Sequence, residues 1–253
     1  MPFDVIGDGL LAAAFASAAD AGLNAIICAA GVPDSRCTDE SAFQRERALL
    51  RRLTERARSR DAVLVYFSGA PVYGGFSGLR VEGEEATPDT PYGRHKLECE
   101  RLVGESEARH LVLRLPNAVG PGGHRGQLIP SLVDQALNGS VLVRTGATRD
   151  LLDVDDLVAI VAALLRRGVA DGVLNVASGV STPVPRIAEL IAAALRVSPS
   201  VVMVAGGDRQ EFSTAKVRGL LEEYPRFEPD YPETILGRRV PEIARALKDR
   251  GQR

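Results

Sequence analysis

The chain has little of several residue types, and each shortage excludes a class of protein. Tryptophan is absent, lysine occurs three times, and aromatic residues make up 5% of the 253 positions. The three cysteines, Cys28, Cys37 and Cys99, are too few and too far apart for a disulfide framework or a zinc site. We therefore expect all three thiols to be reduced and buried.

The net charge is small, and long hydrophobic runs are absent. The formal net charge is -2, and no basic stripe offers a nucleic acid the phosphate contacts that its binding requires. No uncharged apolar stretch reaches roughly 18 residues, and Met1-Pro-Phe-Asp4 supplies no basic region before an apolar run. These absences predict a cytoplasmic protein that binds neither nucleic acid nor a membrane.

The residues that are present predict an α/β fold. A hydrophobic content of 45% suffices for one core and a small additional lobe. Apolar runs predict strands at residues 3–6, 25–30, 62–67, 111–115 and 173–176. Helical periodicity predicts helices ending at about Asp20 and spanning 39–60, 92–105, 153–165 and 185–195. The pattern loosens after Pro121, and the tail from residue 201 is expected to hold a strand, an acidic helix near Leu220 and Pro-rich loops. Strands that alternate with helices imply a parallel sheet covered on both faces.

Two motifs carry chemistry. Gly7-x-Gly9-x-x-Ala12 follows a strand and opens a helix, which is the layout of a dinucleotide phosphate site, and this context favours cofactor binding over a plain turn. Tyr92-Gly-Arg-His-Lys96 places a phenol and an ammonium on one face of a helix. The ammonium can lower the pKa of the phenol towards working pH. Such a pair can move a proton to or from a carbonyl oxygen while a nicotinamide moves the hydride.

Five ordered segments resemble the extended short-chain dehydrogenase/reductase superfamily, in its branch of nucleotide-sugar epimerases, dehydratases and reductases. After the glycine motif these segments are Ser68-Gly-Ala-Pro-Val-Tyr-Gly74, Thr87-Pro-Asp-Thr-Pro-Tyr-Gly-Arg-His-Lys96, Leu113-Arg-Leu-Pro-Asn-Ala-Val-Gly-Pro-Gly122 and Arg149-Asp-Leu-Leu-Asp-Val-Asp-Asp156. The resemblance covers residues 3 to about 179 and implies a Rossmann-like, doubly wound parallel sheet with a small C-terminal substrate lobe. The NAD(P)-binding domain would span residues 1–118 and about 145–178, and the lobe 119–144 and 179–253.

The resemblance also implies roles for individual residues. Tyr92 would be the general acid, Lys96 would support it and hold the nicotinamide ribose, and Ser68 is the candidate third catalytic group. The cofactor, NADP or NAD with NADPH slightly favoured, would contact Gly7, Asp8, Gly9, Leu10, Leu11, Ala29, Ala30, Gly31, Tyr92, Lys96 and Pro116. The substrate would contact Gly69, Ala70, Tyr92, Asn117 and Arg149.

For some of these residues a purely structural role remains open. Arg149 either binds the substrate diphosphate or forms an ion pair with Asp153 or Asp155 at a helix start. Asn117 either contacts the diphosphate or is a turn residue before Gly120. The acidic run at 153–156 is more typical of a helix N-cap than of a metal site, and we assign no metal.

The chain departs from the family pattern at three places. The family's catalytic hydroxyl position is occupied by Gly69, so Ser68 must either reach the site through a bulged strand end or point into the core. The family has a further strand, helix and strand where residues 20–24 stand here, so we expect a sheet shortened on the side that binds adenosine. His95 replaces a small residue and is expected to cover the rim of the site.

The implied activity is NAD(P)H-dependent reduction of a keto group, at C4 of a nucleoside-diphosphate 4-keto-6-deoxyhexose. Dehydration is disfavoured because Ala70 and Pro71 stand where the family's dehydratases carry an Asp-Glu pair. Epimerisation uses the same Tyr92 and Lys96 and remains open, as does a non-catalytic relative that binds a nucleotide sugar or a partner protein. The resemblance further implies a homodimer formed through the helices at 39–60 and 92–105.

Overall fold

A five-stranded parallel sheet forms the centre of the molecule. The computed structural model describes residues 3–18, 23–75 and 78–251. The strands of this sheet, in spatial order, are β1 (Asp4–Ile6), β2 (Ala25–Cys28), β3 (Val63–Gly69), β5 (His110–Leu115) and β9 (Gly172–Asn175). All neighbours pair in parallel, so the predicted α/β sheet is confirmed.

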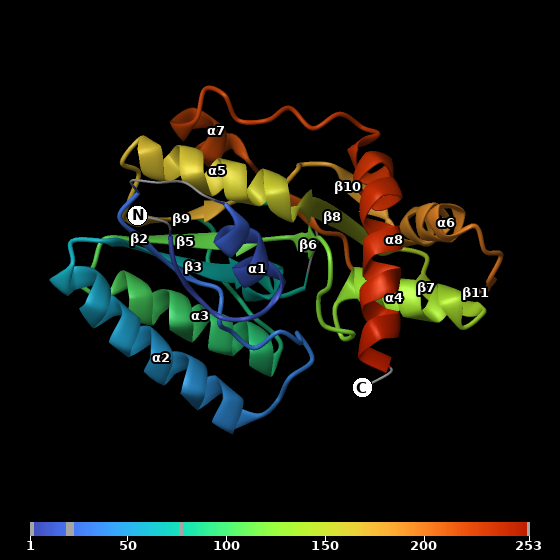
Figure 1. The fold of residues 1–253 in the computed structure, drawn as a ribbon, viewed down its shortest axis with the longest axis horizontal. Coiled ribbons are helices and arrows are strands. Elements are labelled where there is room, and N and C mark those ends of the chain that lie inside the picture. The colour runs from blue at the N-terminus through green and yellow to red at the C-terminus, as the bar shows by residue number, and fades with distance from the viewer. Residues whose placement is uncertain (1–2, 19–22, 76–77, 252–253) are drawn as a thin grey trace.

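Helices cover both faces of this sheet, as Figure 1 shows. One face carries α1 (Leu10–Ser17) and α5 (Val154–Arg166), and the other carries α2 (Glu40–Ser59) and α3 (Pro91–Gly104). Adjacent strand residues point to opposite faces, so Ile27 packs in the core with Phe15 and Leu157 while Ile26 packs with Leu50. The strands are apolar along their length because helices cover both faces of the sheet.

The first two connections of the sheet have opposite hands. The steps from β1 to β2 and from β2 to β3 run in the same direction across the sheet, yet α1 and α2 lie on opposite faces. One of the two crossovers therefore departs from the right-handed rule for parallel strands. In the described residues β1 pairs only with β2 and forms the sheet edge, as a shortened sheet requires. The predicted helix end at Asp20 lies outside the described residues, since α1 ends at Ser17 and residues 19–22 are not described.

A second hydrophobic core lies among the elements that Figure 1 shows at the other end of the molecule. The elements of this region are β6 (Asn117–Val119), α4 (Leu128–Leu137), β7 (Ser140–Arg144), β8 (Thr148–Asp153), β10 (Ser181–Pro183), α6 (Val184–Leu195), β11 (Ser200–Val204) and α8 (Tyr231–Gly251). The strand β11 is exposed and contributes no residue to the core. The strands form two small sheets, β10-β8-β6 and β11-β7. Ile129, Ile187 and Leu236 bring α4, α6 and α8 together.

Several sequence expectations need correction here. The region after Pro121, expected to be loose, contains α4, β7 and β8. In the tail, the expected strand is β11, a short helix ends at Leu220, and a loop at 221–230 holds Pro225 and Pro229, but the 21-residue α8 that follows was not predicted. Cys28 and Cys99 are buried free thiols as expected, whereas Cys37 is only partly buried. The remaining elements are short: η1 (Ala70–Tyr73), β4 (Leu79–Arg80), β12 (Glu211–Phe212) and α7 (Ala215–Leu220). Within the described ranges, no helix has the length and apolar character needed to cross a membrane.

Two acidic residues cap helices. The Asp39 carboxylate accepts a hydrogen bond from the backbone N–H of Ser41 at 2.8 Å, and that of Asp153 accepts from Asp155 at 2.9 Å. Each satisfies a backbone donor that the helix leaves unpaired. Asp153 also accepts from the Arg239 guanidinium at 2.7 and 2.8 Å, which ties α5 to α8. The predicted N-cap at the 153–156 run is thereby confirmed.

Candidate active site

The glycine turn between β1 and α1 packs directly against the end of β2. Gly7 has φ +131°, and a Cβ placed there would lie 2.8 Å from the backbone of Ala29 and 2.9 Å from that of Ala30. Only glycine fits this conformation and this approach. The two predicted cofactor segments, 7–11 and 29–31, therefore meet at the carboxyl edge of the sheet, where ligands of open α/β sheets bind.

The start of α1 has the features of an anion site. Gly9 is the N-cap, and no side chain caps the helix. A Cβ placed on Gly9 would have no neighbouring atom within 4 Å, so this side of the turn is open. Leu10 lies 3.0 Å from the position of a Cβ on Gly120, so the turn also meets the segment that follows Pro116. Asp8 is exposed and Leu11 is half-buried. The first N–H groups of α1 are thus available to a phosphate.

Helix α3 carries Tyr92 and Lys96. Thr90 caps the helix by accepting from the Gly93 N–H at 3.0 Å, and Pro91 occupies the first turn. A Cβ on Gly93 would lie 2.4 Å from the Pro71 carbonyl oxygen, so this glycine lets α3 lie against η1. The Lys96 Nζ lies 5.7 Å from the centre of the Tyr92 ring, and the approach of Gly93 to Pro71 sets this turn of α3 against η1, directly after Gly69.

Lys96 forms a buried ion pair that the sequence analysis missed. Its Nζ donates to Glu46 Oε1 at 2.8 Å, to the Tyr66 hydroxyl at 3.1 Å and to the Phe67 carbonyl at 3.3 Å. All three ammonium donors are therefore engaged by protein acceptors. The side chains of Lys96 and Glu46 are 5% and 2% exposed, so neither charge is shared with water.

The Glu46 carboxylate is fully hydrogen-bonded. Besides Lys96, Oε1 accepts from the Tyr66 hydroxyl at 2.9 Å, and Oε2 accepts from the Val32 N–H at 2.9 Å. His95 Nε2 lies 3.0 Å from Oε2 and donates to it in the tautomer whose Nδ1 accepts from Arg47. A signal for this residue existed, because Glu46 falls three positions after Phe43 and four before Leu50, on the buried stripe of α2.

The charges of this cluster fix its protonation. Burial opposes ionisation of Glu46, but Lys96 and the hydrogen bond from His95 hold its pKa well below its usual value. Burial also opposes the charged form of Lys96, while attraction to Tyr92 and Glu46 raises its pKa above the ordinary range. For Tyr92 burial dominates and raises the pKa, although Lys96 opposes this rise. Lys96 therefore lowers the pKa of Tyr92 as expected, but burial and the opposing charge of Glu46 outweigh it, so the pKa lies above its ordinary value and not below it.

His95 is an interior residue. Its side chain is 1% exposed and stacks on Phe43 with ring centres 4.3 Å apart, so the prediction that it covers the rim is wrong. His95, Cys99 and Glu46 bring possible ligand atoms within 4.8 Å of one another. The Lys96 ammonium already supplies a cation to this carboxylate, and we assign no metal.

Ser68 points into the core. Its hydroxyl donates to Glu100 Oε1 at 2.5 Å, and Glu100 forms a buried ion pair with Arg114 at 2.7 Å. A hydroxyl committed to a buried carboxylate is not available to a substrate, so the catalytic assignment of Ser68 is corrected. Gly69 has extended backbone, with φ -161°, and a Cβ there would make only ordinary contacts at 3.5 Å or more.

The two predicted diphosphate ligands converge on one segment. The Asn117 amide donates to the Asp150 carbonyl and to Gln210 Oε1, both at 3.2 Å. Arg149 Nη2 donates to Asp208 Oδ1 at 2.9 Å, and its Nη1 donates to the Asp208 carbonyl at 3.0 Å. The alternative of an Arg149 pair with Asp153 or Asp155 is thus wrong, because Asp208 is the partner. Neither residue is a simple turn or cap.

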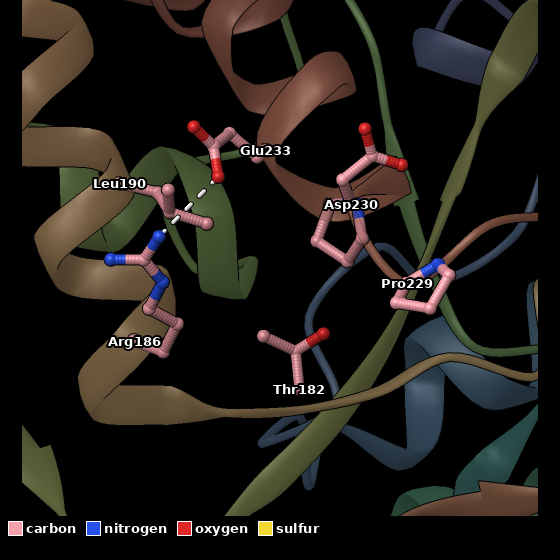
Figure 2. A pocket seen from close by; sticks show the side chains of 7 residues that line it. Thr182, Arg186, Leu190, Pro229, Asp230 and Glu233 are labelled. Atoms are coloured by element: carbon pink, nitrogen blue, oxygen red, sulfur yellow. Dashed lines mark hydrogen bonds and ion pairs between the residues drawn. The ribbon is translucent and has the colours of Figure 1, made fainter.

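A separate pocket of about 280 Å³ lies where β10 and α6 face the start of α8. Figure 2 shows Thr182, Arg186 and Leu190 on one side and Pro229, Asp230 and Glu233 on the other. Arg186 donates to Glu233 across it at 3.3 Å. None of the residues predicted for catalysis, cofactor or substrate lines this pocket.

The geometry of glycine turn, catalytic helix and parallel sheet agrees with a family match over residues 3–177, to the NAD dependent epimerase/dehydratase family. The chain belongs to this family. A GDP-6-deoxy-D-mannose reductase of Pseudomonas aeruginosa is 30% identical over 162 residues, which are 58% of this chain and 53% of that protein. The chain therefore spans about half the length of this curated relative.

Solved structures share the fold. RMD from Pseudomonas aeruginosa complexed with NADPH has a TM-score of 0.71 at 24% identity, over 88% of this chain and 82% of that one. MoeE5 in complex with UDP-glucose and NAD has a TM-score of 0.75 at 22% identity, over 88% of this chain and 80% of that one. The Rossmann-like architecture predicted from the sequence is thus confirmed.

Proposed function

We propose that the chain catalyses NAD(P)H-dependent reduction of the C4 keto group of a nucleoside-diphosphate 4-keto-6-deoxyhexose. The observation that carries this proposal is the proximity of Tyr92 and Lys96, 5.7 Å apart from ring centre to Nζ, on the turn of α3 that packs against η1. The relative from Pseudomonas aeruginosa is named as a reductase of a 6-deoxyhexose nucleotide and lends support.

The residues present fit a nicotinamide dinucleotide at its phosphate end. A Cβ on Gly7 would fill the close approach to Ala29 and Ala30, and the start of α1 is uncapped. When bound, the coenzyme supplies the hydride that reaches the carbonyl carbon. Tyr92 donates its phenolic proton to the carbonyl oxygen and regains a proton from solvent after the step. The raised pKa of Tyr92 suits this direction, because a general acid must be protonated before it acts.

The substrate diphosphate would be bound by Arg149 and Asn117. Arg149 now pairs with Asp208, whose side chain is 39% exposed, so a diphosphate can compete for the guanidinium. Ala70 is buried within η1 and followed by Pro71, so the substrate meets no carboxylate at these two positions. This absence favours reduction over 4,6-dehydration.

Titration and turnover test the proposal together. We expect nicotinamide fluorescence to report binding of NADPH and NADH, and a panel of dTDP, UDP and GDP keto sugars to reveal one that is reduced. Tyr92→Phe should retain binding and lower kcat at least about 100-fold, because only the transferable proton is removed. Absence of a fluorescence response to either coenzyme would instead favour a non-catalytic binding protein.

We further propose that the chain forms a homodimer, in which two copies bind each other through α2 and α3. These helices lie together on the outer side of the sheet (Figure 1). A groove of about 630 Å³ between them is lined by charges of both signs, including Arg47, Arg51, Glu98 and Arg101. Sedimentation at micromolar concentration should give a dimer, and a monomer would argue against this interface.

A further inference from the structure

Glu46 contacts Lys96, Tyr66 and His95, although it belongs to no motif. It reaches Lys96 from α2, across a separation of 50 residues in sequence. A Cβ on Gly31 would lie 3.0 Å from Glu46 Oε1 and 3.2 Å from Lys96 Nζ. The ion pair thus lies against the backbone at the end of the predicted cofactor segment, and Gly31 leaves room for it.

We propose that Glu46 is a positioning residue, which holds Lys96 in a buried ion pair beside Tyr92 and thereby keeps Tyr92 in its protonated, proton-donating form. This inference rests on the proposed reductase function of Tyr92. Because the three donors of Lys96 are directed at Glu46, Tyr66 and Phe67, Lys96 acts on Tyr92 through its charge. The Glu46 carboxylate offsets that charge.

The thiol and phenol groups around Lys96 and Glu46 add no further charge near pH 7. On α3 and β2, the Cys99 and Cys28 thiols have pKa values raised by burial to about 12 and about 11, so both are neutral near pH 7. On β3, burial raises the pKa of Tyr66 well above its usual value. His95 completes the hydrogen bonds of Glu46 from α3.

The charged residues nearby are paired among themselves. Arg47 on α2 forms ion pairs with Glu40 and Glu98, and Asp34 in the loop after β2 pairs with Arg36 at 3.1 Å. Of the described groups that act on the Tyr92 hydroxyl, Lys96 and Glu46 are buried and charged. Removing the negative member leaves the ammonium uncompensated.

Glu46→Gln is the informative variant, because it keeps the size of the side chain and one accepting oxygen and removes its charge. The first proton should then leave the Tyr92–Lys96 pair at a lower pH, whichever of the two releases it. We expect the alkaline limb of the kcat/KM profile for reduction to move down by about one pH unit, as expected for one charge at this range. Glu46→Asp keeps the charge and should restore the limb towards its original position.

The three lysines allow a second measurement that does not need activity. In protein labelled with ε-¹³C lysine, Lys96 gives one of three signals, with Lys216 and Lys248 as internal references. We expect the wild-type Lys96 signal to stay in its charged form above pH 10.5, the ordinary midpoint. In Glu46→Gln its midpoint should fall at least about one pH unit below that of the wild type. Glu98→Gln, an exposed carboxylate on the same helix as Lys96, is the matched control and should leave the Lys96 signal unchanged.

The outcomes separate this inference from the proposed function. A Glu46→Gln enzyme that is slower at every pH, with its alkaline limb and Lys96 signal unmoved, has lost only structural support, and the inference is then overturned. A wild-type Lys96 signal that titrates at or below pH 10.5 overturns it too, even if the variant does not fold. A chain that binds no coenzyme while Lys96 still responds to Glu46 would refute the reductase function and leave the ion pair established.

Discussion

The centre of the parallel sheet and its β1 edge differ in how firmly they are built. At the centre, β3 has seven residues of which six are buried, and α3, which packs on it, begins with a side-chain cap and a proline. At the edge, β1 has three half-buried residues and α1 has eight residues with no side-chain cap. Secondary structure this short depends on its neighbours, so the β1–α1 edge should open at a lower free energy than the β3–α3 unit.

Ion pairs show the same contrast. Glu100 and Arg114 meet in the core with side chains 4% and 5% exposed, whereas Asp4 and Arg60 meet at the surface with 30% and 54% exposed. The chain therefore has a buried ion pair under α3 and an exposed one at the edge strand. Four substitutions test this difference.

The largest effect is expected for Glu100→Gln. Removing one member of a buried pair leaves the Arg114 charge uncompensated, which typically costs about 3–5 kcal/mol of the free energy of unfolding. Urea unfolding followed by circular dichroism measures this loss. A change below about 1 kcal/mol would show that the pair is as replaceable as a surface one.

Gly7→Ala should be the next most damaging. The new Cβ would lie 2.8 Å from the Ala29 backbone at φ +131°, so we expect a loss of about 2–3 kcal/mol in unfolding free energy and weaker NADPH binding. Gly9→Ala is the control, since Gly9 has φ -83° and no atom within 4 Å of its Cβ position. Equal stability of the two variants would contradict the close packing at Gly7.

Gly69→Ser should increase activity. The position has extended backbone and room for a side chain, and a hydroxyl there would resemble the family's missing hydrogen-bond donor to the substrate carbonyl. We expect kcat to rise about tenfold, since a single such donor contributes at least this much in other enzymes. Gly69→Ala adds the Cβ alone and should give no rise. An equal response of the two variants would exclude the hydroxyl as the cause.

Asp4→Asn should have the smallest effect. Asp4 pairs with Arg56 and Arg60 at the sheet edge, and exposed pairs contribute about 0–1 kcal/mol. Thermal unfolding at low and high salt provides the measurement, and the small difference from the wild type should vanish at high salt. A loss as large as that for Glu100→Gln would remove the contrast between the centre of the sheet and its β1 edge.

Local patterns were sufficient for the parallel sheet and its covering helices. The strands ending at Ile6, Cys28, Gly69, Leu115 and Asn175 are apolar runs bounded by turn residues, and the caps Asp39 and Asp153 precede amphipathic stretches. Such signals lie within a few residues of one another. The glycine turn and the Tyr92–Lys96 pair were predictable for the same reason.

Features that depend on distant residues could not be predicted in this way. Glu46 belongs to no local motif, and only the fold brings it to Lys96 and Tyr66. The Pro-rich tail predicted loops, which is right for Pro225 and Pro229, but Pro232 lies in the first turn of α8, and buried apolar residues such as Leu236 and Val240 hold that helix in place. The sequence left Ser68 open between the site and the core, because the face of a strand end depends on its partner, here Glu100.

The opposite hands of the first two crossovers have a consequence for any elongated ligand. In open α/β sheets a crevice forms where neighbouring connections leave to opposite faces, and here α1 and α2 part between β1 and β2, at the outermost pair of strands. A ligand bound across that crevice would contact the sheet on its β3 side and would find no described strand beyond β1. We therefore expect the affinity for a dinucleotide to come mainly from the half nearest β3. A mononucleotide with the same reactive ring should then bind almost as tightly.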